Sequence, residues 1–68
     1  MTDSKLLREK IEESGYRLRF IAAKVGISYQ CLLNKINNSS EFKAGEIQTL
    51  YTLLNLTEKE RESIFFCP

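Results

Sequence analysis

Apolar residues recur along this chain at spacings of three and four, the period of an α-helix, and few stretches alternate with a period of two. We predict helices over residues 4–14, 18–25, 29–37 and about 43–54, and a fifth, short helix that opens at Thr57 and ends near Phe66. The only proline, Pro68, interrupts none of them. The pattern therefore predicts an all-α fold of five helices within one domain, residues 1–68.

The limits of these helices have their own residue signals. Gly15 and Gly26 suit the left-handed turn that ends a helix, and Asn38 tolerates the same conformation. Ser28 is a suitable N-cap for the third helix, and Thr57-Glu58-Lys59-Glu60 is a capping box. The fourth helix has the most regular apolar stripe, which we expect in the core: Ile47, Leu50, Tyr51 and Leu54.

The composition narrows the class of protein. A chain of 68 residues that is 43% hydrophobic and 28% charged is ordinary for a small folded domain. It has no long apolar run and no basic stretch leading into one at the N-terminus, so we expect a cytoplasmic protein without membrane contact. Without histidine, a glycine-rich phosphate loop or a clustered nucleophile and base, we expect neither enzyme activity nor a metal, a cofactor or a small-molecule ligand.

Cys31 and Cys67 are the only cysteines, and they lie 36 positions apart. A disulfide-stabilised secreted scaffold needs several bridges and a zinc site needs about four ligands, so neither fits. We expect two free thiols, with Cys31 as a small, buried or half-buried side chain rather than a redox switch.

The charges are distributed unevenly, although the net charge is only +1. Residues 15–45 contain five Lys and Arg residues against Glu41 alone, a local charge of +4. The residues from Glu46 onward have a local charge of −2. This asymmetry predicts a basic face in the middle of the chain and an acidic C-terminal end. Charges that merely solvate the helix surfaces are the alternative.

The second and third predicted helices, with the short connection between them, have the pattern of a helix-turn-helix. Ala22 is small where two helices must cross closely, Gly26 allows the chain to reverse, and Ile27 fills the angle between the helices. In such a unit the first turn of the second helix projects into the major groove of DNA, which is wide enough to admit a helix.

The segment Ile21-Ala22-x-x-Val25-Gly26-Ile27-Ser28-x-x-x-Leu32 resembles the helix-turn-helix signature of phage Cro and repressor proteins, the lambda-repressor-like (XRE-type) family. The later segments Asn34-Lys35-Ile36-Asn37, Glu41-Phe42, Glu46-Ile47 and Ile64-Phe65-Phe66 resemble a branch of small phage-type regulators. The resemblance covers about residues 5–66. It implies a five-helix DNA-binding domain, with the helix-turn-helix in helices two and three, that acts as a Cro-like repressor of phage or prophage type.

Carried over position by position, the resemblance implies that the third helix reads bases in an operator of double-stranded DNA. Gln30 and Asn34 offer paired donors and acceptors that match the major-groove edge of adenine. Tyr29 can donate a hydrogen bond or pack against a thymine methyl group, which Leu33 can also contact. The residues implied or expected to contact phosphate are Arg17, Arg19, Ser28, Lys35, Asn37 and Lys43.

Two positions depart from the family pattern. The first helix of the motif usually opens with Thr-Gln or Ser-Gln, whereas this chain has Arg17-Leu18. A missing cap costs about 0.5–2 kcal/mol, and Leu18 cannot donate to phosphate, so we expect Arg17 or Arg19 to make that contact. Asn38 stands where the family has a glycine after the reading helix.

One reading helix covers only a few base pairs, so we expect a two-fold homodimer whose two helices reach half-sites about 34 Å apart. The expected interface is apolar and C-terminal: Leu53, Phe65 and Phe66. The alternative for Phe65 is packing against Leu7 and Ile11 within the monomer core.

A function of another class also fits the sequence. A helix-turn-helix derivative that no longer reads DNA can act as a protein-interaction module and modulate another repressor or a polymerase. Leu18, Phe20 and Leu33, expected on the outer side of the motif, and the modest net charge favour this alternative.

Overall fold

The computed structural model describes residues 1–66, and within them every regular element is a helix. The helices are α1 (Ser4–Ser14), α2 (Leu18–Val25), α3 (Tyr29–Ile36), α4 (Ala44–Leu53) and α5 (Glu58–Phe65). The prediction of an all-α fold with five helices is confirmed. Cys31 is half-buried and free, as expected, whereas the expectation for Cys67 lies outside the described residues.

Two helices are slightly shorter than predicted. α3 ends at Ile36 rather than at residue 37, and α4 lacks the residue expected at each of its ends. Lys43 is the N-cap of α4 and has an extended backbone (φ −84°, ψ 159°), and Leu54 is its C-cap (φ −87°, ψ 0°). Cap residues flank a helix without having its full backbone geometry, so the apolar pattern does not locate them.

Predicted capping residues close several helix ends. Ser28 Oγ accepts a hydrogen bond from the Cys31 backbone N–H at 3.0 Å. Thr57 and Glu60 form the predicted capping box, in which each side chain accepts from the other residue's backbone N–H at 3.1 and 2.9 Å respectively. Gly26 ends α2 with a left-handed backbone (φ +86°), where an L side chain would be strained.

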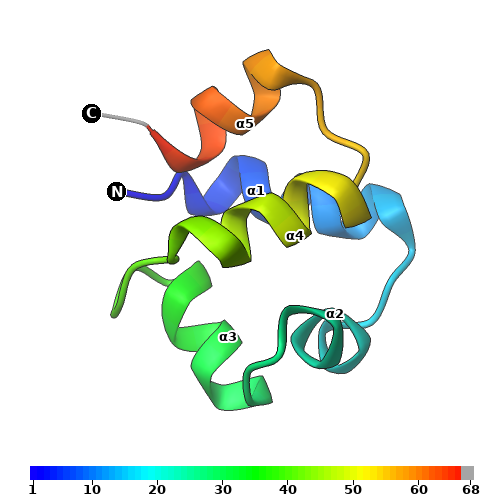
Figure 1. The fold of residues 1–68 in the computed structure, drawn as a ribbon, viewed down its shortest axis with the longest axis vertical. Helices are drawn as coiled ribbons and strands as arrows, with labels where there is room; N and C mark the ends of the chain where they lie inside the picture. Colours follow the sequence, from blue (N-terminus) through cyan, green and yellow to red (C-terminus); the bar gives the residue numbers. More distant parts are fainter. Residues whose placement is uncertain (67–68) are drawn as a thin grey trace.

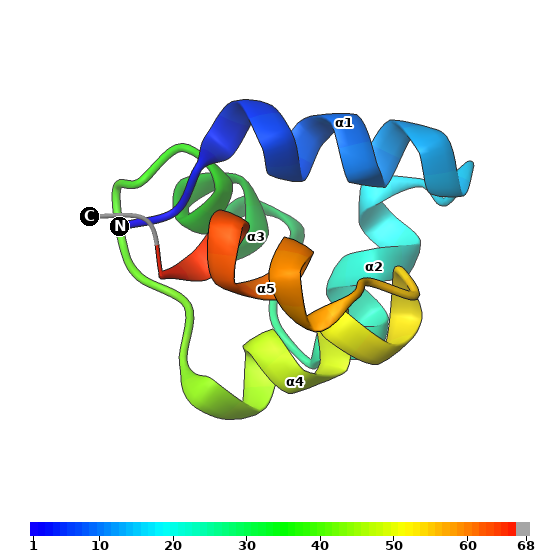
Figure 2. The same ribbon diagram turned by 90° about the horizontal axis from the view of Figure 1, so that it is seen from above.

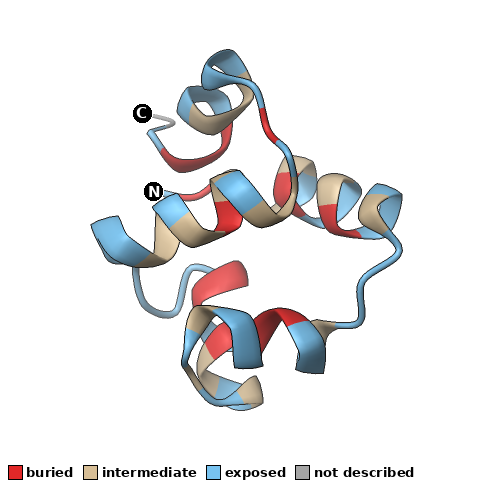
Figure 3. Cartoon of the chain, turned by 45° about the vertical axis from the view of Figure 1, so that its right-hand side comes forward, coloured by how far each residue is buried: buried red, intermediate tan, exposed pale blue. Residues whose placement is uncertain are grey.

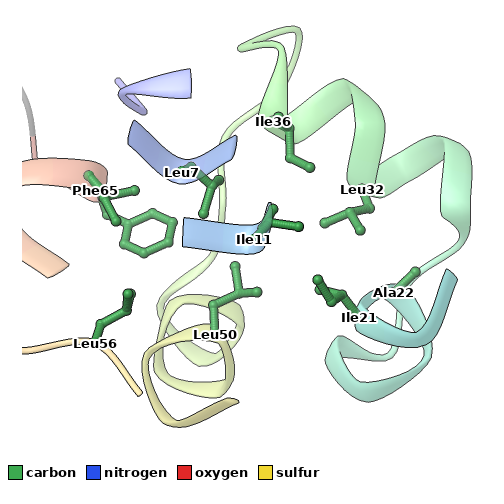
Figure 4. Close-up of a cluster of buried hydrophobic side chains, with 10 residues drawn as sticks. Leu7, Ile11, Ile21, Ala22, Leu32, Ile36, Leu50, Leu56 and Phe65 are labelled. Carbon is green, nitrogen blue, oxygen red and sulfur yellow. The ribbon is translucent and has the colours of Figure 1, made fainter. Parts of the chain in front are cut away.

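All five helices contribute to one cluster of buried apolar side chains (Figures 3 and 4). Leu50 is the only residue of the predicted α4 stripe that is fully buried, while Ile47, Tyr51 and Leu54 pack half-buried around the cluster. A domain of this size has little interior, so many core-facing positions stay partly exposed. The fully enclosed side chains are Leu7, Ile21, Leu32, Ile36, Leu50 and Ile64.

Phe65 belongs to this core and not to a free apolar surface, which corrects the prediction that it forms a dimer interface. Only 6% of Phe65 is exposed, and it lies in the cluster that contains Leu7 and Ile11. Its ring packs edge-on against Phe42, with centroids 5.4 Å apart and planes at 81°. Packing of α5 against α1 buries this side chain. The alternative, that Phe65 packs within the monomer core, is therefore confirmed.

The helices are arranged so that α2 and α3 lie at one end of the molecule and α5 at the other, with α1 and α4 between them (Figure 1). α2 packs against α3 and α4, and α1 packs against α3 and α5 (Figure 2). None of the helices within residues 1–66 combines the length and apolarity that crossing a bilayer requires.

The N-terminal residues are bonded to the end of α3 by Asn38, which has the left-handed backbone that the sequence analysis noted an asparagine tolerates (φ +65°). Asn38 Oδ1 accepts from the Thr2 backbone N–H at 2.9 Å, and its Nδ2 donates to Thr2 O at 2.8 Å and to Ser4 Oγ at 3.1 Å. Ser4 Oγ in turn donates to the backbone oxygen of Ile36, in the last turn of α3. We call Thr2, Ser4 and Asn38 the N-terminal clasp.

Candidate nucleic-acid interface

The α2–α3 connection is a tight reversal that holds the start of α3 at the surface. The backbone N–H groups of Gly26 and Ile27 both donate to Ala22 O, at 2.9 and 3.1 Å, and satisfy a carbonyl group at the end of α2. Ile27 is half-buried and packs against the core. Ser28, which is exposed, then caps the first turn of α3.

α3 has one buried and one exposed face. Leu32 and Ile36 are fully enclosed in the core, whereas Gln30 and Asn34 are exposed on the opposite face. Leu33 is half-buried beside them. The arrangement fixes the helix by its apolar face and leaves a polar stripe accessible.

The two exposed amides of this stripe are bonded to each other. Gln30 Nε2 donates to Asn34 Oδ1 at 3.0 Å, a contact that the i, i+4 spacing favours. Because this bond uses one donor and one acceptor, Gln30 Oε1 and the Asn34 amide group are left to face a further partner. The pair therefore presents an acceptor and a donor side by side.

Arg19 links the start of α2 to the start of α3. Its guanidinium group lies over the ring of Tyr29, 4.5 Å from the centroid, in a cation–π contact. Arg19 is exposed and Tyr29 is half-buried. Arg17, also exposed, occupies the N-cap position of α2 without a side-chain cap, as the sequence indicated. Two cations thus stand at the N-terminal end of α2.

Lys35 is buried rather than exposed, which corrects the prediction that it contacts phosphate. Only 6% of Lys35 is exposed, and its Nζ lies 2.6 Å from Glu46 Oε1 on α4. The same Glu46 oxygen accepts from the Lys43 backbone N–H at 2.9 Å. Burial raises the pKa of Glu46, but these two hydrogen bonds outweigh it and hold the pKa below its ordinary value.

Asn37 and Lys43 are exposed, as predicted, at the end of α3 and the start of α4. Asn37 Oδ1 accepts a hydrogen bond from Arg8 Nη2 at 2.5 Å. Arg8 on α1 therefore brings a further exposed cation to this region, which the sequence analysis did not include. Arg8 and Asn37 are 29 positions apart, so no local pattern indicates their contact.

Carboxylates are absent from the two helices of this region. Residues 15–40 contain four Lys and Arg residues and no Asp or Glu. The acidic residues are concentrated on α1 and α5, and α5 lies at the far end of the molecule (Figure 1). The uneven charge along the sequence thus becomes an uneven charge in space.

The residues predicted to form a dimer interface do not form one surface. Phe65 is in the core, and Phe66 is 63% exposed beside a hollow that Phe42 and Ile47 also line. Leu53 is half-buried and lines a different hollow, between α4 and the end of α2. Of the predicted set, Phe66 remains exposed and available for pairing at the hollow beside Phe42 and Ile47.

Comparison of the chain with protein-family models, with curated proteins and with solved structures gives no match. Within residues 1–66, no three His, Cys, Asp or Glu side chains gather in a way that could hold a metal ion.

Proposed function

We propose that the protein is a sequence-specific DNA-binding transcriptional regulator, a Cro-like repressor that reads an operator with α3. One observation carries the proposal: α3 is fixed in the core by Leu32 and Ile36 and presents Gln30 and Asn34, and neither α2 nor α3 contains a carboxylate. An exposed helix without negative charge suits the anionic major groove, and amide side chains suit base edges.

Base reading in this proposal rests on the amide pair. Asn and Gln bind adenine through its N7 acceptor and N6 donor, and a bidentate contact of this kind discriminates by about 1–3 kcal/mol. Gln30 and Asn34 already orient each other at 3.0 Å, which reduces the conformational freedom lost on binding. Tyr29 and Leu33, both half-buried next to the pair, contribute packing against thymine methyl groups.

Backbone contacts would come from both sides of the reading helix. On one side are Arg17, Arg19 and the uncapped N-terminus of α2, whose free N–H groups favour an anion. On the other side are Asn37 and Lys43, and Ser28 lies between them at the start of α3. Lys35 is not part of this set, because Glu46 holds its ammonium group.

Repression requires only that the protein occupy its site with sufficient affinity. A homodimer would supply this affinity by joining two weak half-site contacts. We assign the pairing contact to Phe66, whose exposed ring and the adjacent hollow can be exchanged between two copies about a two-fold axis.

The experiment that tests the proposal is selection of bound duplexes from a random pool, followed by binding of two variants to the selected and to random DNA. Gln30→Ala should lose about 1–3 kcal/mol on the selected site and discriminate less at one base pair. Lys43→Ala should weaken all duplexes alike and reduce the salt dependence by about one charge. Lys59→Ala, at an exposed position of α5, is the matched control.

Recovery of no enriched motif, or equal effects of the Gln30 and Lys43 variants on both kinds of DNA, would refute base reading by α3. The protein-interaction alternative predicts that no duplex is retained at all. Of the three residues that favoured this alternative, only Phe20 is exposed, at 42%, while Leu18 and Leu33 are half-buried. These three residues therefore provide less exposed apolar surface for a protein partner than the sequence suggested.

A further inference from the structure

A strip of three side chains runs along the outer face of α2. Phe20 and Lys24 are four residues apart in α2, so they lie one above the other on the helix surface, and Tyr16 precedes the first turn of α2 and packs against Phe20. The rings of Tyr16 and Phe20 have centroids 5.0 Å apart, and Lys24 Nζ lies 5.4 Å from the Phe20 centroid. We call these three residues the α2 strip.

The α2 strip is a substantial apolar exposure for so small a domain. Tyr16 and Phe20 are 41% and 42% exposed, and neither belongs to the core or its half-buried edge. Single exposed apolar side chains are normal on a protein surface, whereas contiguous ones mark interaction sites. Here two aromatic rings are adjacent and are held in place by each other.

The α2 strip does not include the residue of α2 that contacts Tyr29 on α3. Arg19, which contacts Tyr29 on α3, lies about 100° around the helix axis from Phe20. At its Lys24 end the strip lies next to α4. Lys24 and Leu53 line a hollow of about 370 Å³ between the end of α2 and α4. An apolar side chain of a partner can enter this hollow while the rest of the partner lies along the strip.

The charged residues of α2 and of its N-cap are all positive. Arg17, Arg19 and Lys24 are exposed, and none of them pairs with a carboxylate in the described part of the chain. Residues 15–40 contain no Asp or Glu at all. The complementary surface therefore combines apolar side chains with carboxylates.

We propose that the α2 strip and the adjacent hollow bind an acidic amphipathic helix of a second protein, in which Asp or Glu residues flank Leu or Phe. Apolar side chains would cover Phe20 and fill the hollow beside Leu53, and the carboxylates would pair with Lys24. This contact is additional to DNA binding by α3, because Phe20, Lys24 and Leu53 are not among the residues assigned to DNA.

Two other occupants fit the observations less well. Nucleobases stack on free aromatic faces, whereas the Phe20 ring already has Tyr16 and Lys24 as neighbours. A second copy of this chain would offer its acidic helices α1 and α5. Between their first and last residues, however, neither helix has an exposed large apolar side chain to accompany the carboxylates.

The test uses a synthetic helical peptide of about 14 residues, roughly four turns, with Leu and Phe on one face and Glu beside them. It is titrated into the isotope-labelled protein and followed by NMR. We expect amide shifts confined to residues 16–25 and 48–53, and weaker binding at high salt. The matched control is the same peptide with each Glu replaced by Gln, which should bind much less.

Phe20→Ser should weaken binding of the Glu peptide by about tenfold or more, since truncation of a central aromatic contact has an effect of this size. Its melting temperature should be nearly unchanged, because Phe20 is outside the core, and its binding to duplex DNA should be unchanged. Asn34→Ala is the converse control, with unchanged peptide binding. DNA binding is thus measured separately, so its failure would not be mistaken for failure of the peptide site.

Equal binding of the Glu and Gln peptides, shifts centred on α3 or α5, or an unaffected Phe20→Ser variant would overturn the proposal. Shifts of the strip on adding oligothymidylate instead of the peptide would assign it to single-stranded nucleic acid. Concentration-dependent sedimentation that Phe20→Ser abolishes would assign it to a second copy. Either result would contradict the proposed partner.

Discussion

Replacement of Lys35 by Met should destabilise the fold, because it leaves the Glu46 carboxylate enclosed without its cation. The two side chains expose only 7% and 13% of their surfaces, with Lys35 Nζ 2.6 Å from Glu46 Oε1. Removing one partner of a fully buried pair costs about 3–5 kcal/mol, since an uncompensated charge remains inside. Met fills the space of the lysine stem, so the lost interaction is mainly electrostatic.

Protonation of Glu46 limits this loss. The ordinary pKa of a glutamate is 4.5, so neutralising it at pH 7 costs about 3.5 kcal/mol. The hydrogen bond from the Lys43 N–H remains and supports the carboxylate at 2.9 Å. We therefore expect a loss of about 2–3 kcal/mol, or roughly 10–20 °C in Tm for a domain of this size.

Thermal unfolding followed by circular dichroism measures the effect in three variants. Lys35→Met should show the full loss. Lys35→Met combined with Glu46→Gln should recover part of it, because the neutral amide leaves no buried charge and its oxygen can still accept from the Lys43 N–H. Lys59→Met, at an exposed position of α5, is the control and should stay within about 0.5 kcal/mol of the parent.

The pH dependence provides the sharper criterion. Burial raises the pKa of Glu46, but hydrogen bonds from Lys35 and Lys43 lower it further, to below 4.5. Its contribution to stability is therefore complete above the unfolded pKa and is lost as the pH falls through the folded pKa. The parent and Lys35→Met should differ most near pH 7 and least well below pH 4.5. A difference independent of pH, or a double variant as unstable as the single one, would refute the reasoning.

Three further predictions concern other parts of the molecule. Leu50→Ala should cost about 2–5 kcal/mol in urea unfolding, because Leu50 has no exposed surface, and a loss below about 1 kcal/mol would place α4 outside the core. Asn38→Gly keeps the left-handed backbone but removes the bonds to Thr2 and Ser4, so chemical denaturation should show a loss of about 1–3 kcal/mol and not a gain. Phe66→Ser should leave the fold intact but lower the sedimenting mass and the affinity for a palindromic duplex; unchanged mass and affinity would contradict the proposed pairing contact.

Local signals in the sequence were sufficient to predict the helices. Gly26, Ser28 and the Thr57–Glu60 box each act within four residues of the helix end that they mark, so their effect is visible without the fold. The left-handed backbone of Asn38 agrees with the tolerance of asparagine for this conformation, which is also a local property. Its bonds to Thr2 were not predicted, because they join positions 36 residues apart.

Tertiary packing determined the burial of Lys35 and Phe65, the two site residues whose predicted positions required correction. Lys35 is three positions after Leu32 and next to Ile36, so helical spacing alone puts it near the buried face. Its charge favoured a surface position, and only the approach of Glu46 from α4 makes burial tolerable. Phe65 and Phe66 are equally apolar, and nothing local indicates which one α5 turns inward. The contacts of α5 with α1 determine that choice.

The N-terminal clasp has a consequence for how α3 opens and closes. Helix ends normally fray, and their amide protons then exchange with solvent at rates set by local opening. Ser28 holds the first turn of α3, and Ser4 and Asn38 hold its last, so the amides of α3 should exchange together, through unfolding of the whole domain. Under the proposed function, a duplex would then meet a helix that is already ordered. The heat-capacity change on binding would reflect the surface covered at the contact, with no added term from coupled folding.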